Sequence, residues 1–427
     1  MSKKALKTIS LLWISSLFGA GCAFLIQVIL ARYLSPVDFG DFAAAFATVT
    51  LFVPLAGFGI AQFWLKVFGE EGWSATRWFS SSFTFIIISS LSVLAFLLFW
   101  AIIGPHDKTM QVVLFILSFY IFGQVALELI GSKLQLEEKY VYLALWQLSP
   151  HLIRLITIGY IVFLSSIILT PLLVALTYTS VAVIFTIIGG VQFYLIKRGN
   201  FHLKGHTLNI SSKTQVIPNI KILISQVWPF GLAGLFHLIY FQSDIILIKY
   251  ISGSEAAANY NVAFTVMVAV YILPTVIYQK FLLPKMHRWA HHDREKFYKT
   301  YNDGNRIMLF LGLLAMILIW LLIPSFIPFI FGANKYTSSI DILNILAFSI
   351  PVLFVASSVG STLVTKEHMK SKVKCMGTVA IINIILNIIL IPTYGTFGAA
   401  IATVISNVIL LLLYYITAIK LVFKLKI

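Results

Sequence analysis

Long apolar runs recur along the whole chain and are separated by short polar segments. The runs lie at about residues 8–31, 40–64, 79–103, 110–130, 141–164, 170–196, 222–248, 257–283, 307–331, 339–364, 373–392 and 396–419. Each is close to the ~20 residues with which an α-helix crosses a bilayer. Lipid offers no partner for backbone N–H and C=O groups, and a barrel would need short alternating segments. The pattern therefore predicts an all-α polytopic membrane protein with twelve transmembrane helices.

Composition and charge support this prediction and orient the helices. Hydrophobic residues make up 59% of the chain and charged residues only 11%, against ~25% charged in soluble domains. If the N-terminus is cytoplasmic, 26 of the 31 Lys and Arg residues fall in inside segments. The outside segments carry four, which are Arg32, Lys108, Lys249 and Lys335. This asymmetry predicts cytoplasmic N- and C-termini, and it assigns the net charge of +16 to topology and anionic lipid rather than to nucleic acid.

One segment of the chain occurs twice. Residues 29–49 (ILARYLSPVDFGDFAAAFATV) resemble residues 246–266 (ILIKYISGSEAAANYNVAFTV) at an offset of 217, so that Arg32 aligns with Lys249. The repeat predicts two six-helix bundles, at 1–198 and 222–427, joined by a polar cytoplasmic linker at 199–221. Duplicated halves in a membrane protein are typical of transporters whose pathway lies between the halves.

Several other chemistries find no support in the sequence. Cys22 and Cys375 lie in distant spans, so neither a disulfide framework nor a thiolate metal site is expected. His287 and His291 have the spacing of metal ligands on a helix, but no third ligand is evident. No P-loop is present, so ATP hydrolysis by this chain is not expected. We therefore expect no catalytic residues, no resident cofactor and no metal.

The strongest candidate for a binding residue is Arg154, near the middle of the fifth run. Ionisable side chains inside spans are costly in lipid, so they usually face a protein interior or a watery cavity. A guanidinium keeps its charge there, and His151 lies one turn earlier on the same helical face. Two interpretations stay open: a cavity-facing role for Arg154 and His151, or a structural pair of Arg154 with an acid.

The other candidates each have two interpretations. Asp244 is either part of a structural pair, with Lys249 or Arg154, or a substrate or ion-coupling site. Arg32 and Lys249 end equivalent spans on the outer side, where they either extend toward lipid headgroups or contact an anionic substrate. Glu128 and Asp341 lie near span ends, which indicates interfacial residues, with ion coupling as the alternative.

Six stretches, in order, resemble polysaccharide flippases of the multidrug/oligosaccharidyl-lipid/polysaccharide exporter superfamily. They are LARYLSPVDFGDFAAAFA, LAGFGIAQF, SDIILIKYISGSEAAANYNVAF, FLLPKMHRWAHHDREKFYKTY, FIFGANKYTSSIDILNILAFS and LNIILIPTYGTFGAAIATVIS. No single stretch is specific, but their order, the chain length and the topology match together. The resemblance covers essentially the whole chain.

The resemblance implies two bundles that meet in a V around a central cavity with alternating access. It implies an undecaprenyl-pyrophosphate-linked oligosaccharide as substrate, flipped across the bacterial cytoplasmic membrane for O-antigen, capsule or exopolysaccharide assembly. Arg32, Arg154 and Lys249 would then neutralise the anionic head of the lipid, since arginine pairs phosphate bidentately. Na⁺ or H⁺ coupling, and a polymerase or ligase of the same pathway as partner, are further expectations.

Two other classes of function are less consistent with the sequence than a flippase. A multidrug cation antiporter of the same fold typically needs membrane-embedded carboxylates in the first bundle. We expect none in the first three spans, and the mid-span charge of this bundle is arginine. A polytopic glycosyltransferase or polysaccharide ligase needs a sizeable extracytoplasmic loop. The predicted outer loops are short and poor in charge.

Overall fold

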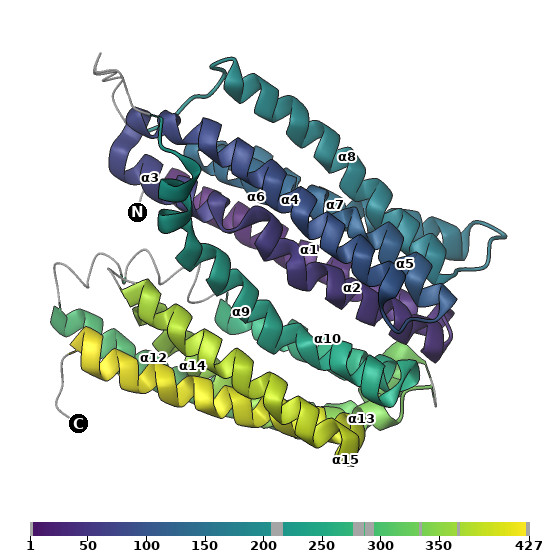
Figure 1. The fold of residues 1–427 in the computed structure, drawn as a ribbon. Helices are drawn as coiled ribbons and strands as arrows, with labels where there is room; N and C mark the ends of the chain where they lie inside the picture. Colours follow the sequence, from purple (N-terminus) through teal and green to yellow (C-terminus); the bar gives the residue numbers. More distant parts are fainter. Residues whose placement is uncertain are drawn as a thin grey trace. The chain divides into compact units, whose positions relative to one another are not determined.

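The residues that the structure describes fold mainly into α-helices (Figure 1). The computed structural model describes residues 3–205, 217–275, 286, 294–332, 335–364 and 368–423, with side chains from residue 10 onward. These ranges contain no β-strand. The predicted all-α fold class is therefore confirmed.

The helices of the first half are α1 (Lys3–Tyr33), α2 (Pro36–Gly57), α3 (Ile60–Glu71), the 3₁₀ turn η1 (Gly72–Arg77), α4 (Trp78–Ile103), α5 (Lys108–Ser118), α6 (Tyr120–Leu136), α7 (Tyr140–Phe163) and α8 (Pro171–Lys197). Those of the second half are α9 (Ile220–Ser252), α10 (Ser254–Thr275), α12 (Arg294–Phe331), α13 (Ser338–Ala347), α14 (Ser349–Thr362), α15 (Met369–Thr417) and the π-helical end η4 (Ala418–Phe423). Proline begins α2 and α8, where its missing N–H costs no hydrogen bond.

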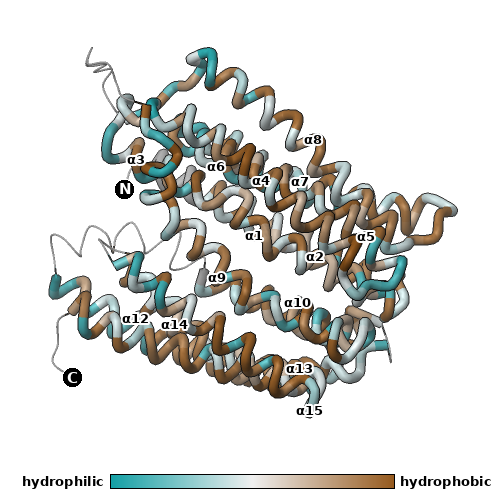
Figure 2. The backbone as a smooth tube through the Cα atoms, viewed as in Figure 1, coloured by the Kyte–Doolittle hydropathy of each residue, from teal (hydrophilic) through white to brown (hydrophobic). Residues whose placement is uncertain are grey.

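The described residues include nine helices that are long and apolar enough to cross a membrane, or ten if the bent pair α13 and α14 is one span. Figure 2 shows apolar stretches along the middle of the helices and hydrophilic stretches at many of their ends. Two of these helical segments, Pro36–Ile103 and Met369–Phe423, exceed one crossing, and each contains two of the predicted runs. The multi-pass architecture is confirmed, and the count of twelve stays a prediction.

Backbone breaks divide the two long segments. Between α2 and α3, Phe58 and Gly59 have φ values of 44° and 72°. Inside α15, Gly395 has φ 57°, three residues after Pro392. A right-handed helix cannot continue through positive φ, and glycine adopts it without a steric penalty. These positions therefore end one helix and start the next.

The chain divides into two compact units, each of which packs mainly on itself. Unit 1 comprises Met1–Ile26 and Thr48–Leu235, and unit 2 comprises Gln27–Ala47 and Phe236–Ile427. Helices α1, α2 and α9 each contribute residues to both units. Unit 2 thus takes in the first copy of the repeated segment almost whole. The prediction of two duplicated halves, at 1–198 and 222–427, stays a prediction.

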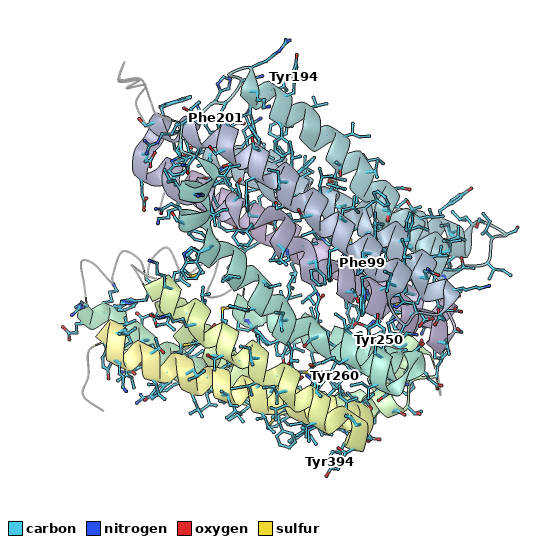
Figure 3. The ribbon with its side chains drawn as sticks, in the orientation of Figure 1. Phe99, Tyr194, Phe201, Tyr250, Tyr260 and Tyr394 are labelled. Carbon is cyan, nitrogen blue, oxygen red and sulfur yellow. The ribbon has the colours of Figure 1, made fainter. Side chains whose placement is uncertain are left out.

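The predicted linker at 199–221 is described at both ends, and residues 206–216 lie outside the described residues. Phe201 is buried, with its ring centroid 5.1 Å from Phe68 and 5.3 Å from Phe79 (Figure 3). Ser81 donates a hydrogen bond to the carbonyl of Pro218. Both described ends of the linker therefore pack on unit 1.

Small residues bring α6 and α8 close together in unit 1. A Cβ atom on Gly123 would lie 2.6 Å from the Cα of Ala182, and one on Gly189 would lie 2.7 Å from the Cβ of Ala126. Between apolar helices the hydrophobic effect supplies little attraction, so close backbone packing stabilises the pair. This packing positions α7, which contacts both helices and carries Arg154.

We predict that Gly189→Ala destabilises the protein by about 1–3 kcal/mol, because the added methyl group forces α6 and α8 apart. Gly190→Ala is the matched control: the next residue of α8 is exposed and has open space around it. We expect it to be neutral or slightly stabilising. Thermal unfolding of the two variants in detergent makes the comparison, and equal transition temperatures would contradict this account of the packing.

Candidate functional site

Arg154 lies in the interior of unit 1. It is on α7, its side chain is 3% exposed, and its guanidinium carbon lies over two tyrosine rings, 5.0 Å from the centroid of Tyr120 and 4.7 Å from that of Tyr178. Its Nη1 donates to the hydroxyl of Tyr120 at 3.4 Å. The predicted burial of this cation is observed, and aromatic faces from α6 and α8 stabilise part of its charge.

The remaining donors of Arg154 have no partner among the residues that the structure describes. Its Nε and Nη2 are buried without a hydrogen bond, and no carboxylate of the described residues pairs with it. A guanidinium in an apolar interior costs about 3 kcal/mol or more, and orphaned donors add to that cost. His151, one turn earlier, is half-buried and lies toward Gly19 of α1. One of the two interpretations of Arg154 was a structural pair with an acid, and no acid of the described residues pairs with it.

Asp244 lies in the interior of unit 2. Its side chain on α9 is 1% exposed and accepts hydrogen bonds from neutral groups on two other helices. Tyr260 of α10 donates at 2.6 Å (Figure 3), Asn387 of α15 donates at 2.6 Å, and Thr403 of α15 donates from its hydroxyl. Three donors compensate part of the lost hydration of the carboxylate, but none of them brings a positive charge.

Further polar atoms surround Asp244. Ser243 donates to Oδ1 of Asn383 at 3.0 Å, and Asn387 donates to the same oxygen at 3.2 Å. Oδ1 of Asn387 is buried and has no hydrogen-bond partner among the described residues. A carboxylate, amide oxygens and hydroxyls are the groups that hard cations prefer as ligands. The arrangement suits either a small cation or a proton on Asp244.

Lys249 pairs with an acid that the sequence analysis did not single out. Its ammonium donates to Oδ1 of Asp41 on α2 and, at 2.5 Å, to the hydroxyl of Ser254. The side chains of Lys249 and Asp41 are 11% and 4% exposed. Among the described residues, the ion pair of Lys249 is with Asp41 and not with Asp244. Asp41 is also a buried carboxylate in the second predicted span, where none was expected.

Arg32 and Lys335 cap two helix ends reciprocally within unit 2. Arg32, at the end of α1, donates to the carbonyls of Ile330, at 2.6 Å, and Phe329, in the last turn of α12. Lys335, just after α12, donates to the carbonyls of Ala31, Arg32 and Leu34 at the end of α1. The last carbonyls of a helix have no partner within it, and cations there also interact favourably with the helix dipole. Burial at this site lowers the pKa of the Lys335 ammonium from its ordinary value.

The two cations of the repeat thus have different partners. Arg32 caps a helix, whereas Lys249 forms an ion pair with Asp41. Each arrangement accounts for a cation at that position without a ligand. A contact of either side chain with an anionic substrate stays a prediction.

The remaining acidic candidates lie on surfaces of their units. Glu128 on α6 is exposed. Asp341 is also exposed and lies in the first turn of α13, where a carboxylate stabilises a helix N-terminus. Among the described residues, no group of three or more His, Cys, Asp or Glu could hold a metal ion. His287 and His291 lie outside the described residues.

The sequence alone does not single out Asp41 or the neutral ligands of Asp244. Asp41 is only the second residue of a predicted span that starts at 40, so it resembles an interfacial acid rather than a membrane-embedded one. Tyr260, Asn387 and Thr403 are neutral and far apart in the sequence. A usable signal exists in Asn383 and Asn387, because amides one turn apart inside an apolar run need buried partners.

Several known proteins are similar to this chain in sequence or in fold. The capsular polysaccharide biosynthesis protein CapF of Staphylococcus aureus is 23% identical over 416 residues, which cover 96% of this chain and 98% of CapF. Two solved structures share the fold. The lipid II flippase MurJ, in an inward closed conformation, has a TM-score of 0.72 at 16% identity over 96% of this chain and 87% of its own. An inward-facing multidrug resistance MATE family transporter has a TM-score of 0.66 at 13% identity over 94% and 93%.

These likenesses confirm the predicted family resemblance and the predicted MATE-like fold. They also agree with the interpretation of the chain as a multi-pass membrane protein. The model of the polysaccharide biosynthesis protein family matches residues 5–289, which is more than half of the chain. The chain therefore belongs to the polysaccharide biosynthesis protein family.

Proposed function

We propose that this protein flips a lipid-linked oligosaccharide from the inner to the outer leaflet of the bacterial cytoplasmic membrane. The carrier in this proposal is undecaprenyl pyrophosphate, and the product serves O-antigen, capsule or exopolysaccharide assembly. The family, the capsular relative and the fold shared with a lipid II flippase support this substrate class. The charge asymmetry supports cytoplasmic N- and C-termini.

Arg154 is the single observation that carries the proposal. It is a permanently charged guanidinium, buried in a membrane-spanning unit, with two donors unpartnered and no acid of the described residues beside it. A fork of N–H donors matches the oxygens of a phosphate, which a cationic drug does not offer. In the described state the guanidinium is covered, so substrate reaches it when helices move during alternating access. His151, on the same face, lies next to the path that we assign to the anionic head.

Arg32 and Lys249 have secondary roles in this proposal. In the described state, Arg32 caps a helix end and Lys249 forms an ion pair with Asp41. An anionic head that passes Arg32 or Lys249 replaces the groups with which that cation now interacts. Contact with the substrate and release of those groups therefore occur together. Because both partner sets lie within unit 2, this exchange is a local event at the predicted outer ends of α1 and α9.

Asp244 is the proposed site of energy coupling. Its buried carboxylate has neutral donors only, and the unpartnered Oδ1 of Asn387 is a further oxygen on a helix that already contacts it. A carboxylate in such surroundings takes up Na⁺ or H⁺ to neutralise its charge. Glu128 and Asp341 are exposed on their units, so the geometry favours Asp244 over them.

We predict that Arg154→Gln lowers surface polysaccharide roughly tenfold or more, because charge-assisted hydrogen bonds to the head are lost. Arg198→Gln is the matched control, since it removes the same charge at the exposed end of α8. Membrane insertion of both variants is verified by immunoblot in a strain that lacks the native gene. Normal export by Arg154→Gln would overturn the role of Arg154. A changed drug-susceptibility panel with normal export would favour a multidrug antiporter instead.

We further predict that Asp244→Asn abolishes the stimulation of flipping by a Na⁺ or H⁺ gradient. The substitution is nearly isosteric, but the amide carries no charge for the ion to neutralise. Asp341→Asn is the control, because it removes an exposed carboxylate of the same unit. Flipping is measured in inverted vesicles with each gradient imposed in turn. Unchanged stimulation in Asp244→Asn, or equal loss in both variants, would contradict the assignment.

A further inference from the structure

Three lysines at the start of α15 do not share one environment. Lys370, Lys372 and Lys374 follow each other at every second residue of the helix. At 100° per residue, Lys370 and Lys374 lie on one face and Lys372 on the opposite face. The exposures agree, since Lys370 and Lys374 are exposed and Lys372 is half-buried. The positive-inside rule does not require Lys372 to face inward, so the rule alone does not explain its position.

The inward face of Lys372 meets aromatic and polar groups of unit 2. Its ammonium lies 5.8 Å from the ring centroid of Tyr414. Tyr414 is buried and fixed against α14, because a Cβ on Gly360 would lie 2.8 Å from its ring. Lys372 also lies on the same face of α15 as Asn383, which accepts a hydrogen bond at 3.0 Å from Ser243 of α9, the helix that carries His237. No carboxylate of the described residues forms an ion pair with Lys372.

His237 is held by its own helix and presents an exposed ring. Its Nδ1 lies 3.2 Å from the hydroxyl of Tyr240, and its ring centroid lies 5.0 Å from that of Phe241. Phe241 in turn contacts Tyr271 of α10 at 6.0 Å between centroids. The side chain of His237 is exposed, whereas Tyr240 is buried. One ring nitrogen, Nδ1, is therefore engaged with Tyr240.

The close approach of α9 and α15 brings the two basic residues together. A Cβ on Gly377 would lie 2.8 Å from the ring of Phe236, so the two helices touch five residues beyond Lys372 on α15 and next to His237 on α9. On α9, Asp244 follows His237 by two turns on the same face. On α15, the buried Asn383 and Asn387 continue the face of Lys372. A polar stripe thus joins a cationic end at Lys372 to the acidic site at Asp244.

We infer that Lys372 and His237 form an anion subsite of unit 2 that binds the diphosphate of an isoprenoid carrier lipid. The inference rests on the proposed function and adds a residue pair to it. The lysine ammonium supplies a point charge for phosphate oxygens, and His237 supplies a hydrogen bond. The ring of Tyr414 lies 5.8 Å from the Lys372 ammonium, and the ring of Phe241 lies 5.0 Å from that of His237, so aromatic faces line the pair. The subsite lies at the predicted cytoplasmic end of α15, where substrate enters.

The test measures binding of farnesyl diphosphate to the purified full chain in detergent, by change in tryptophan fluorescence. We expect Lys372→Gln to weaken binding roughly tenfold or more, and His237→Gln to weaken it by less. Lys374→Gln is the matched control and should stay within about twofold, since it removes the same charge from the exposed face. Lys372→Arg should restore binding. Farnesol, which lacks the diphosphate, should bind all variants alike.

Competition identifies the source of the anion. Inorganic pyrophosphate that competes with farnesyl diphosphate supports a diphosphate subsite, whereas phosphatidylglycerol micelles that compete equally well would show a lipid-headgroup site and overturn the inference. Equal losses in Lys372→Gln and Lys374→Gln would also overturn it. If the wild type flips a labelled lipid-linked saccharide while Lys372→Gln binds normally, only the subsite is wrong. If the wild type flips no saccharide, the proposed function itself fails.

Discussion

The desolvation of charged side chains between apolar helices is the constraint on which the rest of the structure depends. Each buried charge costs several kcal/mol unless other groups replace its water. Asp244 receives three hydrogen bonds from neutral donors, and Lys249 receives the carboxylate of Asp41. Arg154 is compensated only by two aromatic faces and one phenol among the described residues. The compensation of this buried cation is therefore incomplete, and we assign the missing part to an anionic substrate.

The same constraint explains how the predicted outer ends of the helices are built. Carbonyls at the ends of α1 and α12 need donors, and Arg32 and Lys335 supply them reciprocally. Segment 27–47 of the first half is held in unit 2 by these caps and by the pair of Asp41 with Lys249. Arg32 and Lys249, which lie at matching positions of the repeated segment, thus have different structural roles. In the proposed function, their use in transport requires that the substrate displace these partners.

Much of the fold follows from one-dimensional pattern, and much of the site does not. Apolar runs depend only on neighbours in the sequence, so the helices and the multi-pass class were predictable. The inward burial of Arg154 was predictable because its charge is permanent. The partners of Asp244 and Lys249 were not, since each lies on another helix and the choice depends on packing. Lys372 resembles any cytoplasmic lysine until its helical face is known.

The measurement that tests the central claim most directly is translocation by the purified protein in proteoliposomes. A fluorescent undecaprenyl-diphosphate-linked oligosaccharide is placed in one leaflet, and its arrival in the other is followed with a membrane-impermeant quencher. The account predicts protein-dependent translocation of this lipid, which a cationic drug does not inhibit and an anionic isoprenoid diphosphate does. Transport of the drug without translocation of the saccharide would contradict the account.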